Sequence, residues 1–123
     1  MNYDHMLDTI LEGQVPCTGF GHAAHLGAAH AALRRWPFFE AAFHLSDGLR
    51  KTAAAAGAPE KFNATVTLAF LSLVAERMGE ESSEEFVARH ADLTFETLLQ
   101  AGYDRDRLTD PKARDIAPPR RAM

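Results

Sequence analysis

Two histidines one helical turn apart carry the strongest chemical signal in this sequence. His22 and His25 lie in the segment 20–30, which begins Phe-Gly-His-Ala-Ala-His-Leu. At about 100° per residue, His22 falls near the middle of an apolar stripe and His25 near its edge, so both are expected to face the core. Burial and the nearby helix N-terminus each favour the neutral imidazole. That form can bind a metal ion or accept a proton.

Two ligands do not complete a metal site. His22 and His25 can share one divalent metal ion, but no His-Glu-x-x-His motif, Glu-x-x-His motif or cysteine cluster accompanies them. The alternative is structural, with each imidazole bonded to a backbone carbonyl or a side chain at a helix junction, because buried polar groups normally have partners. If the protein is an enzyme, the residues indicate acid–base chemistry by His22 or His25 on a small molecule.

Asn63 and Thr67 are the residues that could complete a polar ligand pocket with the histidines. They share one face of a predicted helix over residues 59–78, and Asn63 lies in its first turn. If the start of this helix meets the start of the histidine helix, both residues line one pocket with both histidines. The alternatives are that Thr67 bonds its own backbone and that Asn63 caps the helix. Apolar residues cover nearly all sides of this helix, which is therefore expected to be central.

Arg50 is a candidate anion-binding residue on a predicted helix over residues 38–56. It lies beside the face that is expected to point inward. That face holds Phe39, Ala42, Ser46, Leu49 and Ala53. An arginine in this position can reach an anionic ligand or an internal carboxylate. Alternatively, it extends to solvent over its apolar stem.

His30 and Cys17 are weaker candidates. His30 falls about 80° to the other side of His22 and is expected at the helix boundary, beside Arg34. Cys17 precedes His22 in a predicted loop. A cysteine–histidine nucleophile pair needs contact and an orienting third group, and a lone cysteine is more often an inert buried side chain.

The elements that must position these residues are all predicted to be helices. Glycine and proline punctuation, together with a Ser82-x-x-Glu85 capping box, divides the chain into helical segments. These cover residues 3–12, 22–36, 38–56, 59–78, 83–90 and 93–101, with short turns after them. No hairpin signal separates alternating apolar runs. The predicted class is all-α, a compact bundle or orthogonal array of four main helices and two short C-terminal ones. Residues 1–116 are expected to form one domain, and residues 117–123 an extended or disordered tail.

Composition excludes several classes of protein. The 123 residues are 46% hydrophobic and 24% charged, as in ordinary globular domains. A net charge of −4 without a basic stripe argues against nucleic-acid binding. The longest apolar run is far short of a membrane span. A single cysteine and the absence of a signal-peptide pattern favour the cytoplasm.

The aromatic residues suggest a partner. There are more of them than so small a core usually buries: Trp36, Phe38, Phe39, Phe43, Phe62, Phe70, Phe86 and Phe95. Some are therefore expected to face a second molecule, and a homodimer is the predicted assembly.

Three segments together resemble a group of small uncharacterised bacterial all-helical proteins. They read Phe20-x-His22-x-x-His25-Leu26, then Gly57-Ala-Pro59-x-Lys61-Phe62-Asn63-x-Thr65-Val66-Thr67, then Glu85-Phe86-x-x-x-His90-x-Asp92-Leu93. The resemblance covers about residues 20–114 and implies one helical domain but no activity. In the similar sequences an aromatic–histidine pair stands where this chain has Phe62-Asn63. That departure removes a third imidazole from any three-histidine metal site.

Two functions follow from these patterns. The first is a helical domain that binds a small molecule or a metal ion in a polar pocket lined by buried histidines. In that reading the ligand-binding residues are His22, His25, Arg50, Asn63 and Thr67. The second is a non-catalytic interaction or dimerisation module whose histidines are structural.

Overall fold

The computed structural model describes residues 2–14 and 21–114, and within these ranges the regular structure is entirely helical. The predicted all-α class is therefore confirmed. The α-helices are α1 (Tyr3–Leu11), α2 (His22–Arg35), α3 (Phe38–Ala55), α4 (Ala64–Arg77), α5 (Ser83–Arg89), α6 (Phe95–Gln100) and α7 (Arg105–Thr109), with 3-10 helices η1 (Pro59–Lys61) and η2 (Pro111–Arg114). Cys17 and the expected tail over 117–123 lie outside the described residues.

Local signals place most helix ends correctly. Each of α1, α2 and α3 begins where predicted and ends one residue early. Gly13 and Gly57 follow α1 and α3 with φ of 75°, a left-handed conformation that stops a helix and favours glycine. At α5, Ser82 Oγ accepts from Glu85 N and Glu85 Oε1 accepts from Ser82 N, both at 3.2 Å, so the capping box is formed.

The predicted helix over residues 59–78 is interrupted. Its first turn is η1, and α4 begins only at Ala64 because Asn63 is the N-cap, with extended backbone. Asn63 Oδ1 accepts from Val66 N at 3.0 Å, while its Nδ2 donates to Leu108 O at 2.8 Å. One side chain therefore caps α4 and ties its start to α7.

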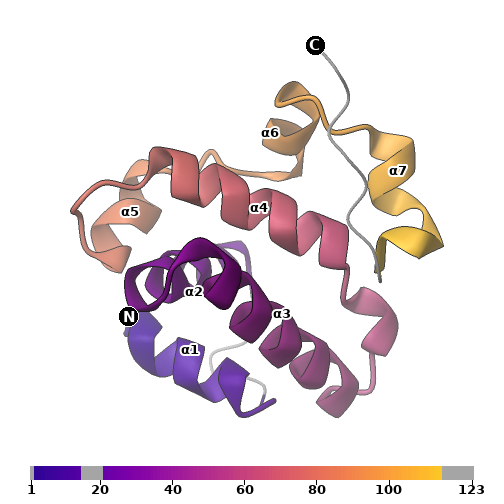
Figure 1. The fold of residues 1–123 in the computed structure, drawn as a ribbon, viewed down its shortest axis with the longest axis horizontal. Helices are drawn as coiled ribbons and strands as arrows, with labels where there is room; N and C mark the ends of the chain where they lie inside the picture. The colour runs from indigo at the N-terminus through magenta and orange to yellow at the C-terminus, as the bar shows by residue number, and fades with distance from the viewer. Residues whose placement is uncertain (1, 15–20, 115–123) are drawn as a thin grey trace.

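The alanine-rich α2 is enclosed by its neighbouring helices. It packs against α1, α3, α4 and α5. Figure 1 shows α4 crossing the molecule between α1–α3 on one side and α6 and α7 on the other. Small side chains let neighbours approach α2 from every direction: Ala28, Ala31 and Ala32 have no exposed surface. The helix expected to be central, α4, thus lies between two groups of helices, and α2 is closely enclosed because its side chains are small.

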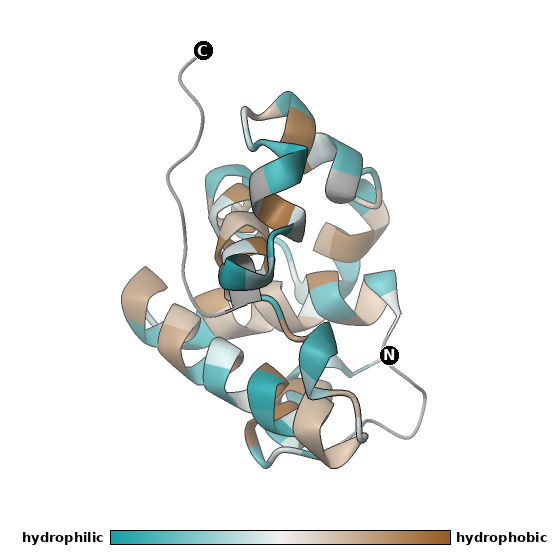
Figure 2. Cartoon of the chain, turned by 90° about the vertical axis from the view of Figure 1, so that its right-hand side faces the viewer, coloured by the Kyte–Doolittle hydropathy of each residue, from teal (hydrophilic) through white to brown (hydrophobic). Residues whose placement is uncertain are grey.

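The buried face of α3 also differs from the predicted one. Its buried residues are Ala41, Ala42, Leu45, Gly48 and Thr52, whereas Phe39 is 85% exposed. The contact with α1 fixes this face, because a Cβ on Gly48 would lie 2.8 Å from Ile10 O. Hydrophobic and hydrophilic residues alternate along the helices (Figure 2), as expected when each helix buries only part of its circumference. Within the described ranges, no helix has the length and apolar character needed to cross a membrane.

Candidate functional site

A cavity of about 590 Å³ lies between α2, α3 and α4, and Lys61 of η1 also lines it. Its floor is apolar and buried, with Leu26, Ala29, Leu45 and Val74 all under a tenth exposed. Partly buried Leu49, Phe62, Val66 and Phe70 add further apolar wall. The polar lining residues are His22, His25, Thr52, Lys61, Asn63 and Thr67. The cavity is thus an apolar space with polar groups along part of its lining.

The structure brings the two histidines, Asn63 and Thr67 to one cavity, but not in the expected surroundings. His22 and His25 are exposed rather than buried in the core. The helical-wheel argument failed because α2 is surrounded by four helices, so its apolar residues do not form a single stripe that marks the inside. Both imidazoles instead lie where α2 begins.

His25 is held in its neutral form. Desolvation by the surrounding protein, and secondarily the nearby His22, lower the pKa of His25 to about 4. This shift is downward even though the residue keeps contact with solvent. At pH 7 the ring therefore offers one N–H donor and one acceptor nitrogen. The His22 ring packs edge-on to Phe70, with 6.5 Å between ring centroids.

The hydrogen bonds of the Asn63 and Thr67 side chains are made largely to the backbone of the protein itself. The Asn63 amide caps α4 and holds α7, as described above. Thr67 Oγ1 donates to Asn63 O at 2.8 Å, which is the backbone bond expected as its structural alternative. Both residues border the cavity, and the Thr67 hydroxyl oxygen keeps its capacity to accept a hydrogen bond.

Arg50 does not belong to this cavity, contrary to expectation. Its side chain is 62% exposed and its Nη2 lies 2.8 Å from Asp47 Oδ1 on the same helix. It borders a separate shallow groove with Phe43 and Leu68. The buried face of α3 lies one residue away from the predicted one, which turns Arg50 outward. Its cation is paired on the surface, the solvent-extended alternative considered from sequence.

The described residues contain no group of three or more His, Cys, Asp or Glu side chains arranged to hold a metal ion. His22 and His25 therefore stand as two candidate ligands without a third from that part of the chain. Lys61 and Thr52, which also line the cavity, were not singled out from sequence. Lys61 carried no signal because it enters the cavity wall only through the turn of η1.

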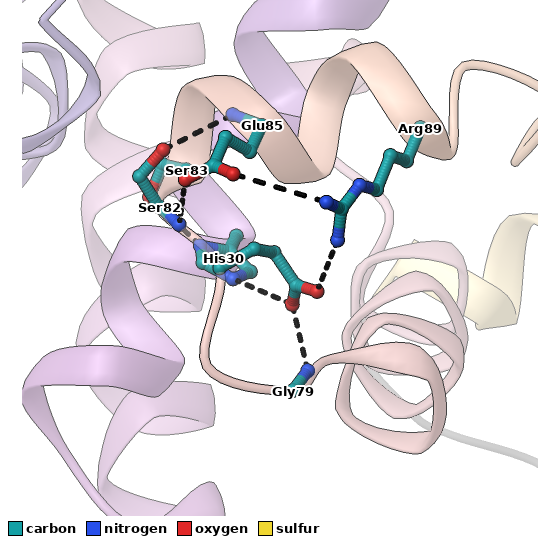
Figure 3. A network of polar contacts seen from close by, with 7 residues as sticks. His30, Gly79, Ser82, Ser83, Glu85 and Arg89 are labelled. Carbon is teal, nitrogen blue, oxygen red and sulfur yellow. Dashed lines mark hydrogen bonds and ion pairs between the residues drawn. The ribbon is translucent and has the colours of Figure 1, made fainter.

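His30 is the main residue that the sequence placed wrongly. It was expected at the helix boundary, yet it has no exposed surface. Its Nδ1 lies 2.8 Å from Ser83 Oγ, and its ring stacks on Phe86 with centroids 4.6 Å apart. Figure 3 shows His30 against the start of α5, next to Ser83 and the capping residues Ser82 and Glu85. No local pattern could reveal a pair 53 residues apart in sequence.

The second nitrogen of His30 faces a carboxylate without a close bond. His30 Nε2 is 3.7 Å from Glu81 Oε1 and has no hydrogen-bond partner within the described structure. Glu81 instead accepts from Gly79 N at 2.6 Å and lies 3.5 Å from Arg89 Nη1. Desolvation lowers the pKa of His30, an effect that Glu81 partly opposes. Neither of the two cavities described here is lined by His30, Ser83 or Glu81, and we interpret the network as a structural connection between α2 and α5.

Comparison of the chain with protein-family models, curated proteins and solved structures finds no match in any of the three.

Proposed function

We propose that this protein binds a small, largely apolar molecule in the cavity between α2, α3 and α4. The observation that carries the proposal is the cavity itself, whose 590 Å³ lies in the range of small-molecule sites. Such sites combine apolar walls with a few polar groups that orient the ligand. Here Leu26, Ala29 and Val74 supply buried apolar wall, and His22 and His25 supply polar groups.

Filling the cavity should abolish binding of an apolar probe. Ala53 lines the cavity, whereas its neighbour Ala54 is exposed and does not. We expect Ala53→Phe to weaken binding of the neutral dye Nile red at least about tenfold, because the ring occupies the ligand space. Ala54→Phe adds the same ring to the same helix and should leave dye affinity unchanged. Dye fluorescence titrations of both folded variants measure this.

Two outcomes would refute the cavity as the binding site. The first is that the wild-type protein shows no saturable Nile red binding. The second is that both phenylalanine variants bind the dye as tightly as the wild type does. Circular dichroism of each variant confirms that the helices are intact, so that lost binding cannot be attributed to unfolding.

A second candidate function, self-association, is favoured by two exposed rings on α3. Phe39 is 85% exposed and Phe43 66% exposed. They lie four residues apart, on neighbouring turns of one helix face. If this face joins two copies of the chain, light scattering will give twice the monomer mass, and Phe39→Ser with Phe43→Ser will give the monomer. A monomeric wild-type protein at high concentration would rule the homodimer out.

A further inference from the structure

The electrostatic character of the cavity is opposite to that of the whole protein. The chain carries a net charge of −4, yet among the described residues that line the cavity none is Asp or Glu and one, Lys61, is a lysine. A carboxylate in the wall would repel an anionic ligand, and a lysine attracts one. The lining therefore favours a negatively charged ligand over a cation.

Lys61 is the basic residue in the cavity lining, and it differs from the paired basic residues of α3 and α4. Lys51 Nζ lies 2.9 Å from Asp47 Oδ2, Arg50 Nη2 lies 2.8 Å from Asp47 Oδ1, and Arg77 Nη1 lies 3.0 Å from Asp92 Oδ2. Lys61 forms no ion pair with any residue that the structure describes. Its backbone is fixed by the η1 turn, where Lys61 N donates to Ala58 O at 3.0 Å. The flexible side chain then carries the ammonium group from a fixed point on the wall.

The cavity also has two chemically different parts. Its buried residues, such as Leu26, Leu45 and Val74, are apolar and less than a tenth exposed. Lys61 is exposed, as is His25, which is neutral at pH 7 and can donate an N–H. A ligand that satisfies both parts has an apolar tail and one polar, negatively charged head.

We infer that the ligand is a small monocarboxylic acid, whose apolar tail fills the buried part of the cavity and whose carboxylate pairs with Lys61. This inference rests on the proposed small-molecule function and specifies the ligand class. Carboxylate oxygens accept hydrogen bonds from an ammonium and from a neutral imidazole N–H. The apolar tail supplies affinity by leaving water, and the ion pair selects acids over alcohols of equal length.

The test compares two probes that differ only in the head group. Octanoate and octan-1-ol have chains of equal length, and each is used to displace Nile red from the full chain at pH 7.5. Octanoate should displace the dye at a roughly two- to fivefold lower concentration, the contribution expected of one exposed ion pair. Lys61→Met should remove this preference and leave octan-1-ol displacement unchanged. Lys112→Met, which removes an exposed lysine outside the cavity lining, should retain the preference.

The outcomes separate this inference from the proposed function. If Nile red binds but octanoate has no advantage over octan-1-ol, or if neither displaces the dye, the carboxylic-acid assignment is wrong and the cavity remains a binding site. A preference for octanoate that survives Lys61→Met would also overturn it. If Nile red itself does not bind, the proposed function fails and the inference fails with it. Added salt should reduce the preference, because exposed ion pairs are screened.

Discussion

Replacing Gly27 by alanine is expected to lower the free energy of unfolding by about 1–3 kcal/mol, the usual cost of overpacking a core. Gly27 is buried on α2, and the Tyr3 ring from α1 lies against it. An added Cβ would lie 2.5 Å from Tyr3 Cγ and closer still to Cδ1 and Cε1. Alanine has a higher helix propensity than glycine by about 1 kcal/mol. A net loss of stability on Gly27→Ala would therefore demonstrate the steric conflict directly.

A double-mutant cycle isolates this conflict. In a Tyr3→Ala background the ring is absent. Gly27→Ala should then be neutral or stabilising, because the higher helix propensity of alanine is no longer offset by a steric conflict. Gly21→Ala is a control for the steric effect alone: a Cβ there meets nothing within 4 Å, and because Gly21 is the N-cap of α2, any cost there reflects capping and not packing. Chemical denaturation of the variants gives the free energies. An equal cost of Gly27→Ala with and without the Tyr3 ring would show that α1 does not pack on α2 as described.

His30→Ala is expected to lower the free energy of unfolding by about 2–5 kcal/mol at pH 7.5. The substitution leaves a void beside Phe86, on which the imidazole stacks. It also leaves the Ser83 hydroxyl without its partner, in a residue that is only 3% exposed. Both costs arise because the site is closed to water. His5→Ala, at an exposed position of α1, should change stability by no more than about 0.5 kcal/mol.

The cost of His30→Ala should shrink as the pH falls. The pKa of His30 is lowered in the folded protein, so below the unfolded value of about 6.5 the unfolded chain binds a proton that the folded chain does not. Wild-type stability therefore decreases as pH falls through this window, and the alanine variant lacks that contribution. Denaturation at pH 7.5 and pH 5.5 measures the difference. A cost that grows toward pH 5.5 would contradict the burial of a neutral imidazole.

The candidate site could be predicted only in part from the sequence. The predicted helix starts correctly indicated that His22, His25 and Asn63 would line one cavity. The expected burial of the two histidines was wrong, and Arg50 was assigned to the wrong side of α3. The metal-binding and acid–base roles of the histidines remain predictions. Lys61 was missed because its position depends on a 3-10 turn that interrupts a predicted helix.

The sequence by itself determined the class of fold and most helix ends to within a residue, but not the start of α4. Capping side chains such as Ser82 and Asn63, and glycines such as Gly57, act on backbone groups within four residues, so their effect can be predicted locally. Tertiary structure alone decided which side of each helix is buried. In α2 the small residues permit contact on every side, so hydrophobicity could not indicate that His30 is enclosed and His22 exposed. Whether a residue of α2 is buried depends on where the neighbours α1, α3, α4 and α5 lie. The spacing of residues within α2 does not indicate those positions.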